Sequence, residues 1–146
     1  MCELPFCLCG EVMHGKRLGT RLGFPTANIA YDPRGRSWPK EGVYIGVAEI
    51  EGDERRYVAI LNQGSHPTAP GGAPTVEAHL LGYPNHALYG QRLTLCYRVF
   101  LRHEQAFPSL EALRAQLAAD RVSAVRWARE NDPSLLQGVS IPLSTD

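Results

Sequence analysis

Glycine and proline residues divide this chain into short segments, and their distribution constrains the fold more than any other feature of the sequence. The 146 residues include 14 glycines and 11 prolines. They concentrate in three stretches, residues 15–25, 33–42 and 64–74. Because both residue types interrupt regular hydrogen-bonded structure, each stretch is expected to be a loop. The pieces between the loops favour a fold of short strands over a helical bundle.

Period-two alternation of apolar residues predicts five or six strands between these loops. The predicted strands are residues 6–14, 26–31, 43–50, 56–61, 75–83 and 91–102. In the last of them, one face is expected to be buried and the other half covered. One face carries Leu93, Leu95, Tyr97, Val99 and Leu101, and the other carries Thr94, Cys96, Arg98, Phe100 and Arg102.

A single long helix is predicted near the end of the chain, over residues 110–130. Ser109 is suited to cap its N-terminus, and Asn131 and Pro133 are expected to end it. Its expected apolar stripe is Leu110, Leu113, Leu117, Ala124 and Ala128. Strands followed by one helix predict a mainly β fold, a closed antiparallel barrel with the helix packed outside. The length favours one domain, residues 1–130, followed by a C-terminal tail, residues 131–146, which is expected to be loosely held from Ser134 onward.

Charge and composition argue against several classes of function. Lys plus Arg and Asp plus Glu each number 15, so no overall positive field attracts nucleic acid. No apolar run is long enough to span a membrane, and no signal peptide is recognisable. A cytoplasmic protein with reduced thiols is therefore expected. The spacing of Cys2, Cys7, Cys9 and Cys96 gives little support to a zinc site, so these residues are interpreted as small apolar fillers.

The first glycine-rich loop has the composition of a phosphate-binding segment. Gly15 and the glycines after it would let backbone N–H groups approach an anion, and Lys16, Arg17 and Arg21 add positive charge. It is not a P-loop, because the Gly-x-x-x-x-Gly-Lys-Ser/Thr pattern is absent. A plain glycine-rich turn remains the alternative.

Thr26 and Asn28 follow this loop and are two residues apart. In an extended segment their side chains point the same way, and their oxygens suit Mg²⁺ held jointly with phosphates. A turn capped by these two side chains is the alternative interpretation.

Glu77 is a carboxylate within an otherwise apolar predicted strand. Near a phosphate donor it could accept a hydroxyl proton, and an exposed glutamate on the strand surface is the alternative. His79 on the same face could be purely structural. Residues 102–107 offer a cation and an aromatic ring to a planar ligand, or serve only as a connector.

Taken together and in order, these motifs resemble the riboflavin kinase (flavokinase) family over about residues 4–130. The strongest is Leu22-Gly23-Phe24-Pro25-Thr26-Ala27-Asn28. The others are Asn62-x-Gly64-x-x-Pro67-Thr68, Val76-Glu77-x-His79-Leu80-Leu81, Leu88-Tyr89-Gly90 and Leu101-Arg102-x-Glu104-x-x-Phe107-x-Ser109-x-Glu111-Ala112-Leu113.

The resemblance implies a six-stranded antiparallel Greek-key barrel that transfers the γ-phosphoryl group of ATP to the ribityl 5′-hydroxyl of riboflavin, giving FMN and ADP. It implies Glu77 as the catalytic base and Thr26 and Asn28 as contacts to Mg²⁺ and the nucleotide. The remaining implied contacts are Gly15 and Arg21 for the nucleotide and Arg102, Glu104 and Phe107 for the flavin.

Some positions depart from the family pattern. His66 stands where the family usually has Arg, Ala69 where an aromatic is usual, and Gly82 where Asp is common. They leave open a catalytically weak or inactive module that binds flavin or nucleotide. A nucleic-acid-binding barrel is disfavoured by the neutral charge. We expect a monomer that lacks the FAD-forming adenylyltransferase domain found in many bacterial relatives.

Overall fold

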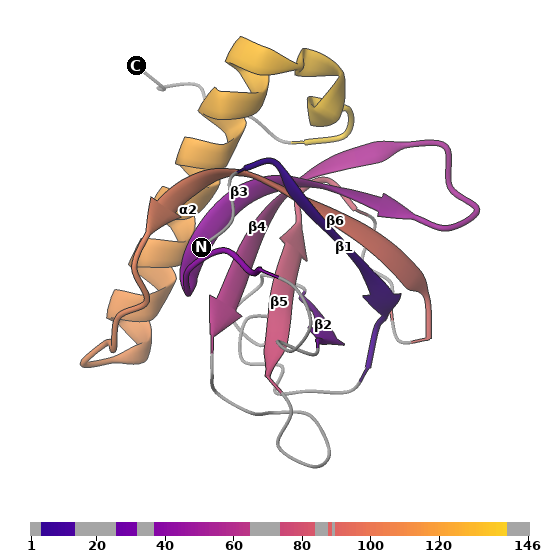
Figure 1. Cartoon of the computed structure of the whole chain (residues 1–146). Helices are drawn as coiled ribbons and strands as arrows, with labels where there is room; N and C mark the ends of the chain where they lie inside the picture. Colours follow the sequence, from indigo (N-terminus) through magenta and orange to yellow (C-terminus); the bar gives the residue numbers. More distant parts are fainter. Residues whose placement is uncertain are drawn as a thin grey trace.

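The structure is a computed structural model that describes residues 4–13, 26–31, 37–64, 74–83, 88 and 90–139. Six strands and a long helix make up most of these residues (Figure 1). The strands are β1 (Phe6–Glu11), β2 (Ala27–Ala30), β3 (Gly42–Ile50), β4 (Arg56–Gly64), β5 (Thr75–Leu80) and β6 (Arg92–Arg102). Helix α2 (Leu110–Asn131) and the short 3₁₀ helix η2 (Pro133–Leu136) follow. Each predicted strand and the predicted helix are confirmed, with ends that differ by a few residues.

The six strands form one antiparallel sheet in the order β1-β6-β3-β4-β5-β2. A bridge between Met13 and Asn28 joins the continuation of β1 to β2, so the sheet curls into a nearly closed barrel. The predicted mainly β barrel with an outer C-terminal helix is confirmed (Figure 1).

Alternation along the strands fills the barrel with apolar side chains, which we call the inner core. The largest of its fully buried residues are Tyr44, Tyr97, Ile29, Leu61, Leu93, Leu95 and Val76. The Tyr97 hydroxyl donates to Gln63 Oε1 at 2.6 Å, and Gln63 Nε2 donates to the Pro39 carbonyl at 2.7 Å. These bonds satisfy the buried amide of Gln63, as a stable apolar interior requires.

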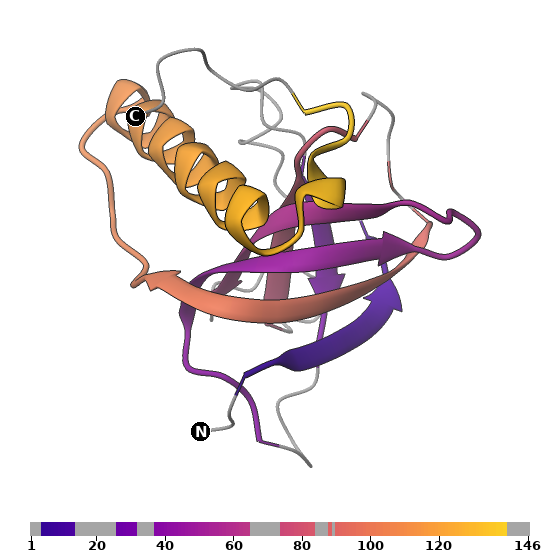
Figure 2. The same cartoon turned by 90° about the horizontal axis from the view of Figure 1, so that it is seen from above.

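Helix α2 packs outside the barrel, where it covers part of the outward face of the sheet (Figure 2). This outer core consists of Val43, Ile45, Val47, Val58, Ile60, Leu81, Ala124, Val125, Ala128 and Leu135. The predicted stripe is correct for Ala124 and Ala128 but wrong for Leu110, which is 56% exposed. The buried residues of α2 extend from Asp120, at its middle, to Ala128, and the helix contacts β4 and η2. Among the described helices, none is long and apolar enough to cross a membrane.

Strand β6 departs from the predicted alternation at two places. Its register against β3 shifts between Ile45 and Gly46 and again between Val43 and Tyr44. Each shift inserts an unpaired residue into β6, and a bulge of this kind exchanges the two faces of a strand. Phe100 therefore packs toward the inner core, whereas Val99, predicted to share a face with Tyr97, is 36% exposed.

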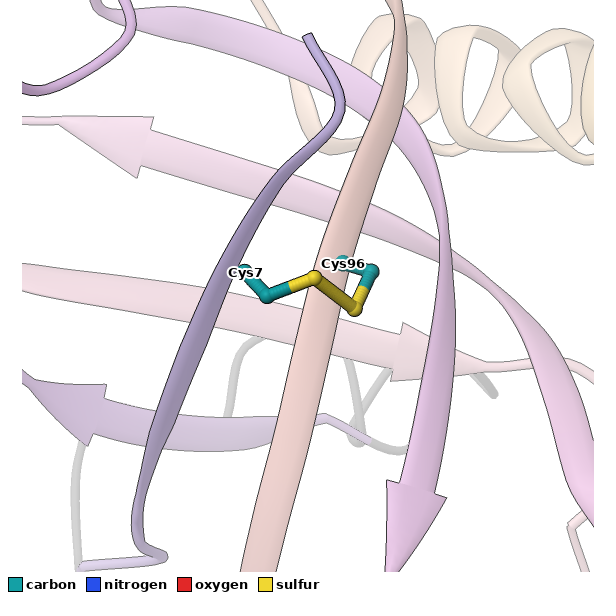
Figure 3. Close-up of a disulfide and its surroundings, with 2 residues drawn as sticks. All are labelled: Cys7 and Cys96. Atoms are coloured by element: carbon teal, nitrogen blue, oxygen red, sulfur yellow. A yellow bond between two sulfur atoms is a disulfide. The ribbon is translucent and has the colours of Figure 1, made fainter.

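Cys7 and Cys96 form a disulfide between β1 and β6 (Figure 3). The two residues are direct cross-strand partners although they lie 89 positions apart in the sequence. The expectation of reduced cysteines acting as apolar fillers is wrong for this pair, because an antiparallel register places their side chains together on the outer face. Cys9 has a free, exposed thiol, and Cys2 lies outside the described residues.

The segment after α2 is held against the barrel. The Asp132 backbone N–H donates to Ala128 O, and its side chain caps η2 and pairs with Arg56 Nη2 at 2.6 Å. Leu135 is only 1% exposed and lies in the outer core. The expectation of a loosely held chain from Ser134 onward is therefore wrong at Leu135, because its apolar side chain completes the packing beneath α2. The predicted domain boundary at residue 130 is untested and remains a prediction.

Replacing Leu135 with Ala should lower the free energy of unfolding by about 2–5 kcal/mol, because it leaves a cavity in the outer core. The matched control is Leu110→Ala, an exposed leucine at the start of α2, which should change stability by less than about 0.5 kcal/mol. Urea unfolding followed by circular dichroism measures both. Equal, small effects of the two variants would contradict the burial of Leu135.

Candidate active site

Asn28, Glu77 and Asn62 form a row across three neighbouring strands. Glu77 on β5 pairs with Asn28 on β2 and, on its other side, with Asn62 on β4. Paired residues of adjacent strands project from the same face of the sheet. Since the flanking residues Val76 and Ala78 belong to the inner core, the row projects outward. Glu77 and Asn28, which belong to two separate sequence motifs, are thus brought together on the outer face of the barrel.

Glu77 is held in a setting that favours its protonated form. Burial of its carboxyl group is the main cause that raises its pKa, and the negative charge of Glu104 raises it further. A carboxylate whose pKa is raised toward neutrality is better suited to accept a proton at physiological pH than an ordinary one. The outward face of β5 therefore carries a group with the properties of a general base. His79, the next outward residue, lies opposite Ile60 and has no assigned role.

Glu104 reaches this base from the segment that follows β6. Its carboxylate lies against the backbone of Gly64 at the end of β4: a Cβ added to Gly64 would stand 2.6 and 2.7 Å from the two carboxylate oxygens. No side chain other than hydrogen leaves room for Glu104 in this position. Gly64 therefore contributes to the site because it has no side chain to displace the Glu104 carboxylate.

Thr26 and Asn28 offer oxygens suited to a hard cation. Thr26 precedes β2 directly, and its Oγ1 is buried and has no hydrogen-bond partner among the described residues. Asn28, two residues further on, is 4% exposed. Within the described ranges, no three His, Cys, Asp or Glu side chains gather as a metal site. The donor set fits Mg²⁺ that takes its remaining ligands from phosphates and water.

Arg102 is engaged in a buried ion pair with helix α2. Its Nε and Nη2 donate to the two carboxylate oxygens of Asp120 at 3.0 and 2.8 Å, and Gln116 Nε2 also donates to Asp120 at 2.9 Å. Asp120 is 2% exposed. Because Asp120 accepts hydrogen bonds from Nε and Nη2, Arg102 is anchored to α2. This anchor fixes the position where the segment 103–109 begins. Phe107 lies beside it, with its ring centroid 5.9 Å from Arg102 Cζ.

The predicted flavin contacts are therefore separated into two places. Glu104 lies near Glu77, whereas Arg102 and Phe107 lie at the N-terminal half of α2. Their role toward flavin stays a prediction.

Of the other predicted positions, Gly15 and Arg21 lie outside the described residues, as do the departures His66 and Ala69. Gly82 is described and has a φ of +79°. A Cβ there would come within 2.7 Å of Val139 and 2.8 Å of Arg55 Nη2. This departure from the family pattern thus serves the packing of the C-terminal segment.

Sequence reasoning left three members of this region without a role: Asn62, Gly64 and Asp120. Asn62 and Gly64 belong to the motif Asn62-x-Gly64-x-x-Pro67-Thr68. Only the register of β4 against β5 shows that this motif lies beside Glu77. Asp120 interrupts an apolar helix face, and that position alone could have indicated a buried ion pair.

Comparisons with known proteins show to which family the chain is related. The profile of the Flavokinase family (riboflavin kinase) matches residues 2–128. The bifunctional riboflavin kinase/FMN adenylyltransferase of Pseudomonas fluorescens is 40% identical over 121 residues, 82% of this chain and 37% of that protein. The RNA-binding riboflavin kinase RibR of Bacillus subtilis is 32% identical over 114 residues, 77% of this chain and 47% of that protein. The matched region thus spans less than half the length of each of these relatives.

Among solved structures, the riboflavin kinase from Trypanosoma brucei superposes with a TM-score of 0.63 at 23% identity, covering 95% of this chain and 90% of that one. At this identity the likeness shows the shared fold alone. A family profile that spans nearly the whole barrel and helix, together with relatives of 32 and 40% identity, shows that this chain belongs to the riboflavin kinase family.

Proposed function

We propose that this protein uses ATP to phosphorylate riboflavin at the ribityl 5′-hydroxyl, giving FMN and ADP. The observation that carries the proposal is Glu77, a carboxylate with a raised pKa between two asparagines on the outer face of a riboflavin kinase family barrel. In the reaction a bond forms between the hydroxyl oxygen and the γ-phosphorus of ATP. The bond from that phosphorus to the β–γ bridging oxygen breaks, and ADP leaves.

Glu77 would take the proton that the hydroxyl loses. Phosphoryl transfer depends mainly on positioning and on neutralising charge, so the base needs above all to hold the hydroxyl in line. Burial of the Glu77 side chain limits competing contacts with water, and its place in a strand fixes its direction. Glu104 tunes this base through its charge.

Thr26 and Asn28 would hold Mg²⁺ together with the nucleotide phosphates. The metal ion supplies neutralisation of the charge on the β- and γ-phosphates. The buried, unpartnered Oγ1 of Thr26 supports this assignment, because a buried acceptor without a donor favours a bound cation. Gly15 and Arg21 are retained as proposed nucleotide contacts, and Arg102, Glu104 and Phe107 as the proposed flavin region.

The proposal extends to the setting in which the protein works. We retain the predictions of a cytoplasmic monomer, of residues 1–130 as the kinase unit, and of riboflavin, FMN, ATP and ADP as its only partners. Since one relative is named as an RNA-binding riboflavin kinase, RNA is the alternative partner to test.

The decisive experiment is a kinase assay with riboflavin, ATP and Mg²⁺, with FMN separated by chromatography. The protein should form FMN, and Glu77→Gln should lower kcat by about 10²–10⁴-fold, because it removes the general base. Flavin binding without any FMN formation by the unchanged protein would sink the kinase proposal and favour the inactive binding module.

The loss in this variant should not come from unfolding. A raised folded-state pKa means that Glu77 favours folding below its ordinary pKa of 4.5 and loses that contribution as the pH rises through the raised value. At neutral pH, Glu77→Gln should therefore be at least as stable as the parent. A lower melting temperature would show that its low activity has another cause.

The pH profile of kcat should report the base. Activity should fall toward acid as Glu77 becomes protonated, with a midpoint above its ordinary pKa of 4.5. Glu104→Gln removes the nearby negative charge, so it should move this midpoint to lower pH. Glu111→Gln, on the first turn of α2, is the charge-matched control and should leave the midpoint in place. Coinciding profiles of the parent and Glu104→Gln would contradict the coupling.

Gly64→Ala should impair the enzyme by displacing Glu104. Because Gly64 has an ordinary backbone conformation, alanine is tolerated by the strand itself, and only the Glu104 carboxylate must move. We expect kcat to fall on the order of ten- to hundredfold with little change in stability. In a Glu104→Ala background the same substitution should have almost no further effect. Additive losses in the double variant would show that Gly64 acts independently of Glu104.

A further inference from the structure

Asn62 carries a buried hydrogen-bond acceptor that the fold does not use. Its Oδ1 is buried and has no hydrogen-bond partner among the residues that the structure describes. An unsatisfied buried acceptor destabilises the folded protein, so its presence calls for an explanation beyond packing. Asn62 is half-buried on β4, and the two outward residues that precede it, Val58 and Ile60, are apolar and belong to the outer core.

The described cross-strand neighbours of Asn62 offer no donor to its Oδ1 when Glu77 is ionised, the form in which Glu77 would act as the base. Its cross-strand partners are Glu77 on β5 and Val43 on β3. An ionised Glu77 has no proton to give, and valine has no polar hydrogen. Arg102, beyond Val43, directs Nε and Nη2 to Asp120. Within the part of the chain that the structure describes, Asn62 Oδ1 therefore remains available to a hydrogen-bond donor of a molecule bound at the site.

The row of three side chains separates two subsites. Neighbouring strands are ~4.8 Å apart, which places the backbones of Asn28 and Asn62 about 10 Å apart with Glu77 between them. Asn28 and the unpartnered Thr26 lie on one side of the base, where metal and phosphates are proposed. Asn62 lies on the other side, toward β3 and β6, from which Glu104 approaches.

We infer that Asn62 is a substrate-binding residue whose Oδ1 accepts a hydrogen bond from a secondary hydroxyl of the acceptor's polyol chain. This inference rests on the proposed function, in which that chain is the ribityl group of riboflavin. The terminal hydroxyl lies at Glu77, and the hydroxyl next along the chain lies one strand further over, at Asn62. A single hydrogen bond at this point sets which hydroxyl meets the base and so determines the site of phosphorylation.

The test compares two flavins that differ only in the side chain. Riboflavin carries the ribityl chain, and lumiflavin carries a methyl group in its place. Asn62→Val removes the acceptor and keeps a residue that favours strands, so the variant should be at least as stable as the parent. Thr94→Val, another polar-to-valine change on the outward face of a strand, is the matched control. Flavin fluorescence measures binding, and steady-state kinetics measures KM.

Asn62→Val should weaken riboflavin binding about five- to tenfold, the loss of one neutral hydrogen bond, and leave lumiflavin binding unchanged. KM for riboflavin should rise while KM for Mg²⁺–ATP stays the same. Thr94→Val should alter none of these values. Equal weakening of both flavins would overturn the inference, and so would unchanged riboflavin binding or a selective loss of Mg²⁺–ATP affinity.

Failure of the inference and failure of the proposed function give different results. FMN formation with an unchanged riboflavin KM in Asn62→Val overturns the inference alone. An Asn62-dependent preference for riboflavin over lumiflavin without FMN formation overturns the proposed activity and supports the inference. A parent protein that binds neither flavin overturns both.

Discussion

The register between β2, β5 and β4 is the constraint on which the candidate site depends. Side chains alternate between the two faces of a strand, so a slip of one residue would turn Glu77 into the barrel and Ala78 out of it. The register is held by the inner core, since Val76, Ala78 and Leu61 must all be buried together. The candidate catalytic residues are thus positioned by apolar residues of the inner core.

The ion pair between Arg102 and Asp120 makes a second, longer-range connection. It joins the end of β6 to the middle of α2 through two hydrogen bonds, and Gln116 supplies a third. Burying two charges carries a desolvation cost, and breaking such a pair by removing one partner typically costs about 3–5 kcal/mol. The pair therefore fixes the segment that delivers Glu104 to Gly64.

Much of the fold could be predicted from local sequence, because strands and the helix follow from periodicity and punctuation. Glu77, Thr26 and Asn28 were also predicted, from chemistry and from the family resemblance. What could not be predicted depends on pairings between distant residues. The bulges that reverse Val99 and Phe100 depend on β3, and the Cys7–Cys96 bond depends on β1 meeting β6. The roles of Asn62 and Gly64 likewise arise only once β4 lies beside β5.

The disulfide also determines how the molecule comes apart. The three stretches rich in glycine and proline, residues 15–25, 33–42 and 64–74, all fall between Cys7 and Cys96. The chain between these cysteines is a covalent ring, so a protease that cuts once in any of these stretches opens the ring without releasing a fragment. The cut protein keeps its full mass until a reductant reaches the bond, which Cys7 on the exposed face of β1 permits.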